Sequence, residues 1–518
     1  MSLLALLLKR TVNVSNQIAK RKRVDPILQQ KRVLKKLLHK AAITQFGTFY
    51  HFDEILQSKN IQLEFRKRVP LHDYDSIAPW WQKAEAGESD VTWPGKVKYF
   101  ALSSGTSGSP SKHIPVTREM IKAMQKVGRR EVLVLDNYKF PAKIFDKQFL
   151  SLGGSTNLQY NGINYRGDLS GIQAKKQPRW FRPFFRPEKE ITDIRDWETK
   201  LQKMVERAPK WDVGIIAGVP AWVQILLERV IEYYNLKHIH ELWPDFQLYI
   251  HGGVSIEPYR KKLQSLFGRE VLLIDTYLAS EGFIACQIHP DNRGMLLSTD
   301  SGIYYEFLPF NEDNFDADGN LKDKFAKTLT LAQVELNKPY ALILSTCAGA
   351  WRYLIGDVIK FVSLDPYEII IDGRTKHFLS ICGEHLSVDN MTMGLKRACE
   401  IHNTNVNEFT VVGIPIENRH THKWYLGTED PYLNQNKEAF IQTLDKQLCL
   451  LNDDYATERK HALKDLQVEV LPTHVFHDFL AHIGKAGGQH KFPRVLKGKP
   501  LEQWNEYLSK YVYKTNDN

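Results

Sequence analysis

Residues 103–112 have the composition of a phosphate-binding loop. They read Ser-Ser-Gly-Thr-Ser-Gly-Ser-Pro-Ser-Lys and end on Lys112. Backbone N–H groups and hydroxyls can surround phosphate oxygens while a lysine neutralises their charge. A Walker A loop is excluded, because it needs Gly immediately before the lysine and Ser or Thr after it, and here Ser111 and His113 hold those positions. A solvated surface loop is the alternative, since such clusters commonly form loops.

Two more polar clusters follow apolar runs that are typical of buried strands. Gly252 and Gly253 come after one run, and Thr276, Tyr277 and Glu281 come after the next. Paired glycines let a flat ring approach the backbone. A ring, hydroxyls and a carboxylate can stack a base and hold Mg²⁺, which favours carboxylate and phosphate oxygens. A glycine-rich turn, a core tyrosine and a surface glutamate explain the same residues.

A third cluster, Trp351–Asp357, follows another apolar run. Asp357 comes directly after a glycine, where its carboxylate can accept hydrogen bonds from ribose hydroxyls or simply form a β-turn. His420 and His422 have the spacing of a metal-binding pair, but their polar neighbours favour a solvated loop. No Gly-x-Ser-x-Gly sequence is present, so serine hydrolase chemistry has no support.

The elements that position these clusters alternate between strand and helix. Short β-prone runs predict sheet-core strands at residues 97–102, 246–250, 271–274 and 341–344, and residues 211–220 predict a buried strand that runs into a turn. Helical spacing of apolar residues predicts a helix followed by a loop over 24–70, and further helices from an N-cap at Thr117, around 222–230, and at 390–401 and 437–451. This alternation favours an α/β architecture, with ligands bound at the strand ends. A turn is predicted at 372–376, and the change to longer helices beyond it predicts a domain boundary there.

Composition narrows the class of protein. A chain of 518 residues predicts at least two domains, and 43% apolar with 25% charged residues is ordinary for a globular protein. The charge of +10 is spread along the chain, so it favours anionic small substrates over nucleic acid.

The apolar start, Met1–Leu8, is too short for a membrane span. Five scattered cysteines predict neither disulfides nor a zinc site, and they fit a reducing cytoplasm. The oligomeric state stays open.

Taken together and in their order along the chain, the motifs described above resemble those of the adenylate-forming superfamily. Residues 103–108 with Lys112 look like its phosphate loop, Tyr277-x-x-Ser-Glu281 like its adenine and magnesium motif, and Arg352–Asp357 like its ribose motif. Within it, the chain resembles the Gretchen Hagen 3 (auxin-responsive) acyl acid amido synthetase family, as a non-plant member. The resemblance covers nearly the whole chain, and includes residues 41–47, 103–117 and 489–494. The residues from His377 to His385 differ from those of the plant members, so the acyl substrate stays open.

The resemblance implies a large N-terminal adenylate-forming domain, residues 1–372, with β-sheets flanked by helices. A small, mobile α+β domain, residues 373–518, follows. The implied reaction adenylates a carboxylic acid with ATP and Mg²⁺ and passes the acyl group to an amine, expected to be an amino acid. An acyl-CoA ligase and a non-catalytic nucleotide-binding protein are the alternatives. No nucleic acid or membrane partner is expected.

The resemblance also implies roles for individual residues. The phosphates would be bound by Ser103, Ser104, Gly105, Thr106 and Lys112. The adenine would be bordered by Gly252, Gly253, Thr276 and Tyr277. The rest of the nucleotide would be bound by Asp357 and Arg374. Glu281 would bind Mg²⁺, and Lys491 would bridge the carboxylate and the α-phosphate. Val219, Trp222 and the loop 155–165 are the candidates for the acyl pocket, although ordinary core packing on a helix is the favoured explanation of Trp222.

Overall fold

The structure is a computed structural model that forms two compact units. The first contains residues up to Ser103 and from Lys112 to Thr375, and the second contains the described residues beyond Thr375. The described residues are 24–103, 112–134, 138, 141–177, 179–289, 292–316, 319–375, 378–379, 381–382, 384, 386–416, 419–483 and 492–516.

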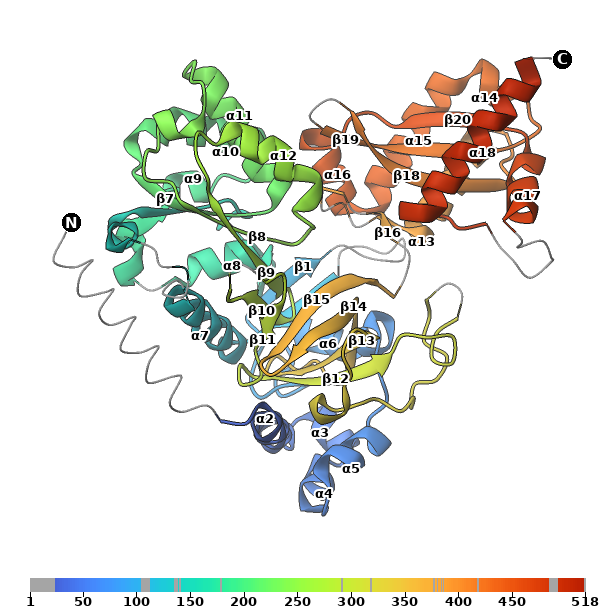
Figure 1. The fold of residues 1–518 in the computed structure, drawn as a ribbon. Helices are drawn as coiled ribbons and strands as arrows, with labels where there is room; N and C mark the ends of the chain where they lie inside the picture. Colours follow the sequence, from blue (N-terminus) through green and yellow to red (C-terminus); the bar gives the residue numbers. More distant parts are fainter. Residues whose placement is uncertain are drawn as a thin grey trace. The chain divides into compact units, whose positions relative to one another are not determined.

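An eleven-stranded sheet organises the first unit (Figure 1). Its order is β12 (Ile303–Pro309), β13 (Pro339–Thr346), β14 (Tyr353–Leu364), β15 (Tyr367–Arg374), β11 (Met295–Leu297), β10 (Gly282–Gln287), β9 (Leu272–Ala279), β8 (Leu248–Gly252), β7 (Val213–Ala217), β3 (Gln148–Ser151) and β6 (Phe185–Arg186). Pairing is antiparallel from β12 to β9 and parallel from β9 to β6. The parallel part needs crossover helices. Two of them are α11 (Pro220–Tyr233) and α12 (Glu257–Leu266).

A four-stranded sheet and a set of helices complete this unit. The sheet order is β2 (Lys112–Val116), β1 (Tyr99–Ser103), β5 (Tyr165–Gly167) and β4 (Gln159–Tyr160). Other helices are α2 (Pro26–Ala41), α3 (Gln45–Phe49), α4 (Phe52–Gln57), α5 (Ile61–Arg68), α6 (Tyr74–Glu85), α7 (Arg118–Val134), α8 (Leu169–Lys175), α9 (Lys189–Thr192) and α10 (Trp197–Arg207). In α7, the hydroxyl of Thr117 accepts a hydrogen bond from the N–H of Met120 at 3.1 Å, which confirms the predicted N-cap.

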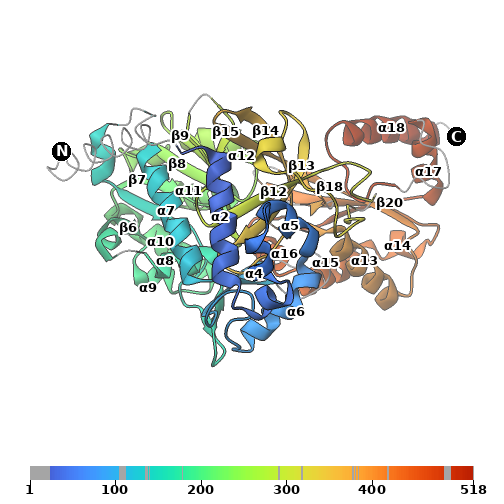
Figure 2. The same ribbon diagram turned by 90° about the horizontal axis from the view of Figure 1, so that it is seen from below.

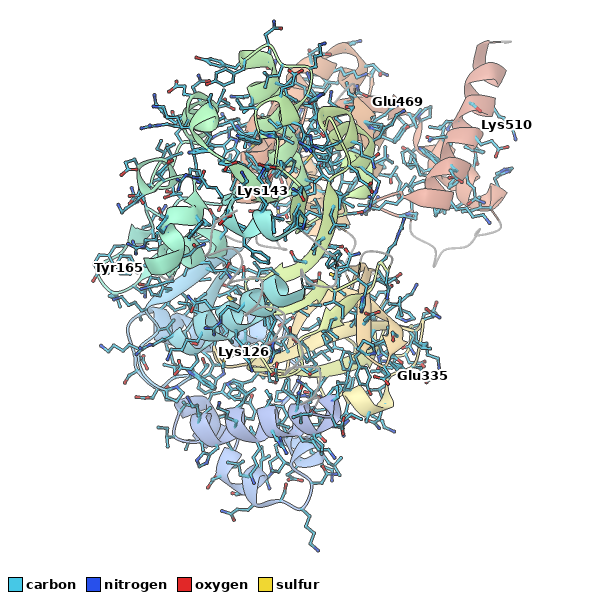
Figure 3. All side chains as sticks on the ribbon, turned by 60° about the vertical axis from the view of Figure 1, so that its left-hand side comes forward. Lys126, Lys143, Tyr165, Glu335, Glu469 and Lys510 are labelled. Atoms are coloured by element: carbon cyan, nitrogen blue, oxygen red, sulfur yellow. The ribbon has the colours of Figure 1, made fainter. Side chains whose placement is uncertain are left out.

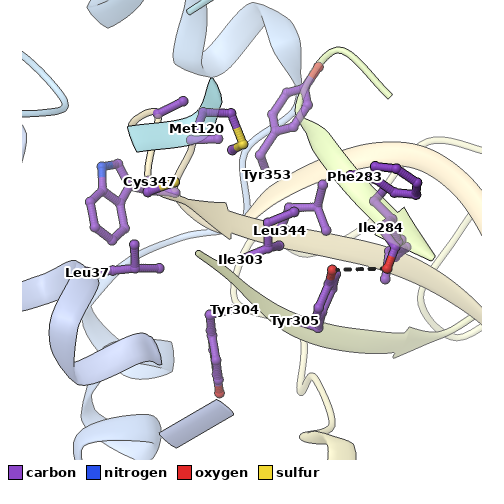
Figure 4. Close-up of a cluster of buried hydrophobic side chains, with 14 of the residues drawn as sticks. Leu37, Met120, Phe283, Ile284, Ile303, Tyr304, Tyr305, Leu344, Cys347 and Tyr353 are labelled. Carbon is purple, nitrogen blue, oxygen red and sulfur yellow. Dashed lines mark hydrogen bonds between the residues drawn. The ribbon is translucent and has the colours of Figure 1, made fainter. Parts of the chain in front are cut away.

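The core of the first unit lies between the helices and the antiparallel strands. In α2, the apolar residues Leu34, Leu37, Leu38 and Ala41 recur at helical spacing and are all buried. Figure 4 shows Leu37 on the same side of the core as Cys347, with Ile303 and Leu344 on neighbouring strands. Strand β12 is almost wholly buried, as expected of a near-continuous apolar run.

The second unit is α+β. Its three-stranded sheet has the order β18 (Glu408–Ile416), β19 (Arg419–Gly427) and β20 (Gln467–Leu471), and a small hairpin pairs β16 (Phe378–Leu379) with β17 (Leu386–Ser387). The helices are α13 (Val388–His402), α14 (Tyr432–Gln435), α15 (Lys437–Leu451), α16 (Asp453–His461), α17 (Thr473–His482) and α18 (Gly498–Asn516). The predicted α/β class, with a large first domain and a small α+β second one, is therefore confirmed. In the part of the chain that the structure describes, no helix combines the length and the apolarity that crossing a membrane requires.

Most predicted elements are present, and some local predictions are wrong. The loop predicted after the first helix of 24–70 is one of these, because α3, α4 and α5 lie between Gln45 and Arg68. A strand overlaps each of the five predicted β-prone runs, and α15 has the predicted bounds. The predicted turn at 372–376 is wrong for its first three residues, because Asp372, Gly373 and Arg374 continue β15 and the last two pair with β14. The predicted solvated loop at His420 and His422 is also wrong. Both lie in β19, which pairs on both sides, and His422 is fully buried.

Candidate active site

An aspartate, a tyrosine and an arginine from three strands meet in the first unit. Asp357 lies in β14, and its two carboxylate oxygens have different partners. Arg374, from the end of β15, approaches Oδ1 with its Nε at 2.7 Å. Tyr277, from β9, donates its phenol proton to Oδ2. Burial, followed by the charge of Asp357, raises the pKa of the Tyr277 phenol well above its usual value. The carboxylate is thereby held in one orientation.

This contact shows that the antiparallel part of the sheet curls. Three strands (β15, β11 and β10) separate β14 from β9 in the sheet order. Neighbouring strands lie about 4.8 Å apart, so a flat sheet would hold β14 and β9 far beyond hydrogen-bond reach. The Tyr277–Asp357 hydrogen bond is possible only because the sheet bends round on itself. The curl brings residues that are 80 positions apart in sequence to one place.

Glu281 lies beside this group, in the turn between β9 and β10. Its side chain is buried, and burial raises the pKa of its carboxyl to about 7. The positive charges of Lys112 and Arg374 act in the opposite direction, and the negative charge of Asp357 adds to the rise. A buried carboxyl that ionises near neutral pH, surrounded by mixed charges, is typical of a functional site.

Lys112 is placed by the hairpin that flanks the phosphate-loop candidate. Strands β1 and β2 pair through Ser103 and Lys112, so the two ends of the loop are fixed side by side. The Nζ of Lys112 lies 5.3 Å from the ring centroid of Tyr74, and the hydroxyl of Tyr74 accepts a hydrogen bond from the N–H of His113 at 2.9 Å. Tyr74 therefore supports both the backbone and the ammonium group at this position.

The glycine pair predicted at the adenine lies at the end of β8, beside β9. Gly252 ends β8 opposite Thr276 of β9. A Cβ at Gly252 would lie 2.4 Å from the carbonyl oxygen of Thr276, so only glycine fits without moving β9. Gly253 follows with a φ of +83°, and a Cβ there would lie 3.5 Å from Val219. Val219, the residue just before α11, therefore borders the glycine pair.

The other predicted acyl-pocket residue packs against an aromatic neighbour. The ring of Trp222, in α11, meets the ring of Trp197 edge-on, with centroids 4.1 Å apart. This is the packing alternative for Trp222, and its acyl contact stays a prediction. The predicted loop 155–165 is partly wrong, because it contains the short strand β4 and ends on the first residue of β5.

Several predicted residues fall outside this description. Ser104, Gly105, Thr106 and Lys491 lie outside the described residues, and Ser103 is described only by its backbone. Their predicted contacts with phosphates and with the acyl carboxylate stay predictions. The residues that the structure does bring together are Lys112, Tyr277, Glu281, Asp357 and Arg374.

One supporting residue was not predicted from its sequence. Arg352 belongs to the ribose-motif stretch, yet its side chain is fully buried and pairs with Glu306 of β12 at 3.1 Å. It also donates hydrogen bonds to Thr328 and to the carbonyl of Val69. Arg352 therefore anchors the start of β14, which carries Asp357. The available signal was one glutamate within the apolar run of β12.

The fold is one that acyl acid amido synthetases and acyl-CoA ligases of known structure share. The chain is similar in structure to the GH3.15 acyl acid amido synthetase, with a TM-score of 0.59 and 16% identity over 96% of this chain and 95% of that one. It is also similar to 2-hydroxyisobutyryl-CoA ligase in complex with 2-HIB-AMP and CoA, with a TM-score of 0.60 and 14% identity over 93% and 92% of the two chains. At these identities, the likeness establishes the fold.

The sequence identifies the family. Residues 17–205, 296–371 and 389–500 match the N-terminal, central and C-terminal domains of the GH3 family. Among curated proteins, the jasmonoyl–L-amino acid synthetase JAR4 of Nicotiana attenuata is 25% identical over 543 residues, which cover 90% of each chain. The chain belongs to the GH3 family, as its motifs predicted.

Proposed function

We propose that this protein is an ATP-dependent ligase. It activates a carboxylic acid as an acyl-adenylate and then transfers the acyl group to the amine of an amino acid, forming an amide. The observation that carries the proposal is the meeting of Lys112, Glu281, Asp357 and Arg374 in a chain of the GH3 family. Related proteins are named as amido synthetases, which supports the amide product.

In the first half-reaction, an oxygen of the acid attacks the α-phosphorus of ATP and the bond to pyrophosphate breaks. Protein groups contribute by positioning and by stabilising negative charge. Lys112 would hold the β- and γ-phosphates, with Ser103, Ser104, Gly105 and Thr106 of its loop. Lys491 would stabilise the charge between the acid and the α-phosphate.

Other residues would hold the nucleoside. Asp357 would accept hydrogen bonds from the ribose, and since Tyr277 and Arg374 already occupy both of its oxygens, its remaining lone pairs would serve the sugar. Tyr277 is only 5% exposed. It would therefore act mainly through Asp357, while Gly252, Gly253 and Thr276 would border the adenine.

Mg²⁺ fits the residues that are present. Glu281 and Asp357 supply hard carboxylate oxygens close together, and no cluster of three or more metal-ligating side chains occurs among the described residues. This matches the preference of Mg²⁺ for one or two carboxylates completed by phosphate oxygens. Glu281 would hold the ion, which would neutralise phosphate charge when bound.

In the second half-reaction, the amine nitrogen attacks the carbonyl carbon of the adenylate. The bond to the phosphate oxygen breaks, AMP leaves, and the nitrogen loses a proton. Val219 and Trp222 are our candidates for the acyl pocket. We also propose a reducing compartment such as the cytoplasm, because all five cysteines are free thiols.

Two assays test the proposal. Carboxylate-dependent pyrophosphate–ATP exchange, measured across a panel of acids, should occur and should fall steeply in Glu281→Ala and Lys112→Met. The exposed residues Glu312 and Lys96 offer matched controls, Glu312→Ala and Lys96→Met, which should keep full exchange. Absence of exchange with every acid would leave only nucleotide binding.

Product analysis separates the two ligase chemistries. With ATP and an accepted acid, mass spectrometry should detect an amide when mixed amino acids are supplied. A thioester formed with CoA, without any amide, would replace the proposal by an acyl-CoA ligase.

A further inference from the structure

A second concave site lies in the first unit, between α2 and α7. Figure 2 shows these two helices side by side. The α2–α7 groove has a volume of about 620 Å³, which is within the usual range of small-molecule sites. None of the residues assigned above to the nucleotide line it.

The floor of the groove is apolar. It is formed by Val33, Leu37, Trp93, Ala123 and Cys347. Figure 4 shows Leu37 directed toward Cys347. Burial raises the pKa of the Cys347 thiol to about 12, so this floor residue is neutral. A floor of this kind gains free energy by contacting hydrocarbon or an aromatic body.

The rim of the groove is basic. Arg32, Lys36 and Lys40 come from α2, and Lys122 and Lys126 come from α7, against two acidic residues. The Nζ of Lys40 lies 6.0 Å from the ring centroid of Trp93, so this rim ammonium group lies beside a floor residue.

Part of this charge is neutralised within the groove. Lys40 pairs with Glu119 at 3.7 Å, and Lys126 (labelled in Figure 3) pairs with Asp300 at 2.9 Å. Within the described part of the chain, Arg32, Lys36 and Lys122 have no ion-pair partner. Three unpaired cations around an apolar floor leave positive charge to be matched by a ligand.

We propose that the α2–α7 groove binds an anionic amphiphile. Its apolar body lies on the floor, and its anionic head group contacts Arg32, Lys36 and Lys122. The charge of the chain's own first 23 residues does not complement that of the groove. They contain six basic and no acidic side chains and would add to the positive charge.

Decyl phosphate is a suitable probe, because it has both required parts and, lacking a carboxylate, cannot be adenylated. Calorimetric titration of the full chain at physiological salt, below the micellar concentration, should detect saturable binding. Decanol, inorganic phosphate and decyltrimethylammonium should each bind at least tenfold more weakly. Equal binding of decanol, or no binding of decyl phosphate, would overturn the proposal, whether or not the protein makes acyl-adenylates.

Variants locate the binding. Arg32→Glu with Lys36→Glu and Lys122→Glu should weaken decyl phosphate binding at least tenfold. The matched control, Lys31→Glu with Lys35→Glu and Arg129→Glu, changes exposed residues of the same helices outside the groove and the net charge equally, and should keep binding within about twofold. Ala123→Phe, which fills the floor and leaves the charges intact, should also abolish binding. Undiminished binding in either groove variant would overturn the assignment.

Discussion

Glu281 is a carboxyl group that the fold has placed where ionisation is costly. Its neighbours include two cations, yet burial outweighs them and sets the pKa near 7. The physical reason is that desolvation penalises the charged form more than these partners stabilise it. At the residue scale, the ionised form of Glu281 is therefore destabilised by burial, and a bound cation would stabilise it.

The raised pKa of Glu281 predicts how the free energy of unfolding depends on pH. The pKa of Glu281 is about 4.5 in the unfolded chain and about 7 in the fold, so the folded state binds more protons between these values. Unfolding free energy should therefore decrease as pH rises from 4.5 to 7, by at most about 3 kcal/mol from this group. Glu281→Gln should remove that loss and be the more stable protein at pH 8. Urea titrations at pH 5 and pH 8 measure the effect.

The exposed substitution Glu312→Gln is the control, and it should leave the pH dependence unchanged. If Glu281→Gln lost stability with rising pH as steeply as the parent protein, burial of this carboxyl would not be the cause.

Gly356 and Gly373 allow a second prediction at this scale. Gly356, next to Asp357, has a φ of +93°, whereas Gly373 has ordinary extended backbone and open space where a Cβ would be. Gly356→Ala should cost about 1–2 kcal/mol and lower the rate of exchange. Gly373→Ala should change stability by less than about 1 kcal/mol and leave turnover unchanged. Thermal melts and exchange rates of the two variants decide, and equal losses would refute the conformational argument.

At the scale of elements, strand β14 is the part that carries the site. The ion pair between Arg352 and Glu306 anchors the chain just before β14 begins. Further along the strand, Asp357 contacts Arg374 of β15 and Tyr277 of β9. Both partners of the pair are almost fully buried, so neither charge can be satisfied by water if the other is removed.

Arg352→Met should therefore cost about 3–5 kcal/mol, because Glu306 would be left buried without its partner. The double substitution Arg352→Met with Glu306→Leu should recover most of this loss. Urea titration of both variants and of the parent measures the difference. A cost of the single substitution below about 1 kcal/mol, as for a surface pair, would contradict this role.

At the scale of the whole molecule, both ends of the connection between the units are fixed. Arg374 is held in the ladder of β15 and by Asp357. On the other side, the buried carboxylate of Glu384 accepts hydrogen bonds from the N–H groups of Ile381 and Cys382 and from His422 at 2.8 Å. We predict that the second domain pivots about residues 373–376, where its predicted boundary begins.

We predict that motion about this pivot gives Lys491 a role in only one half-reaction. Lys491→Ala should lower pyrophosphate–ATP exchange about 10²–10³-fold, because a preorganised donor is lost where charge develops. Amide formation from a supplied acyl-adenylate should be retained. The control Lys499→Ala, at an exposed position, should affect neither assay. Equal loss in both assays would show that Lys491 does not act specifically in adenylation.

Local chemistry made part of the site predictable. Lys112, Glu281 and Asp357 each stand beside residues whose types already suggested phosphate, metal and ribose binding, and the strands that carry them were visible as apolar runs. The errors came where partners are remote. His422 looked solvated next to Arg419 and His420, but it is buried because Glu384, 38 residues earlier, folds against it.

The amino-acid sequence by itself determined the family, the alternation of strands and helices, and the candidate groups, because these depend on side-chain type and short-range spacing. Only the tertiary structure decided which groups meet. The curl of the antiparallel strands joins Tyr277 to Asp357, and burial sets the charge state of Glu281. Long-range pairing and desolvation depend on the surroundings that the whole fold creates, so no local pattern contains them.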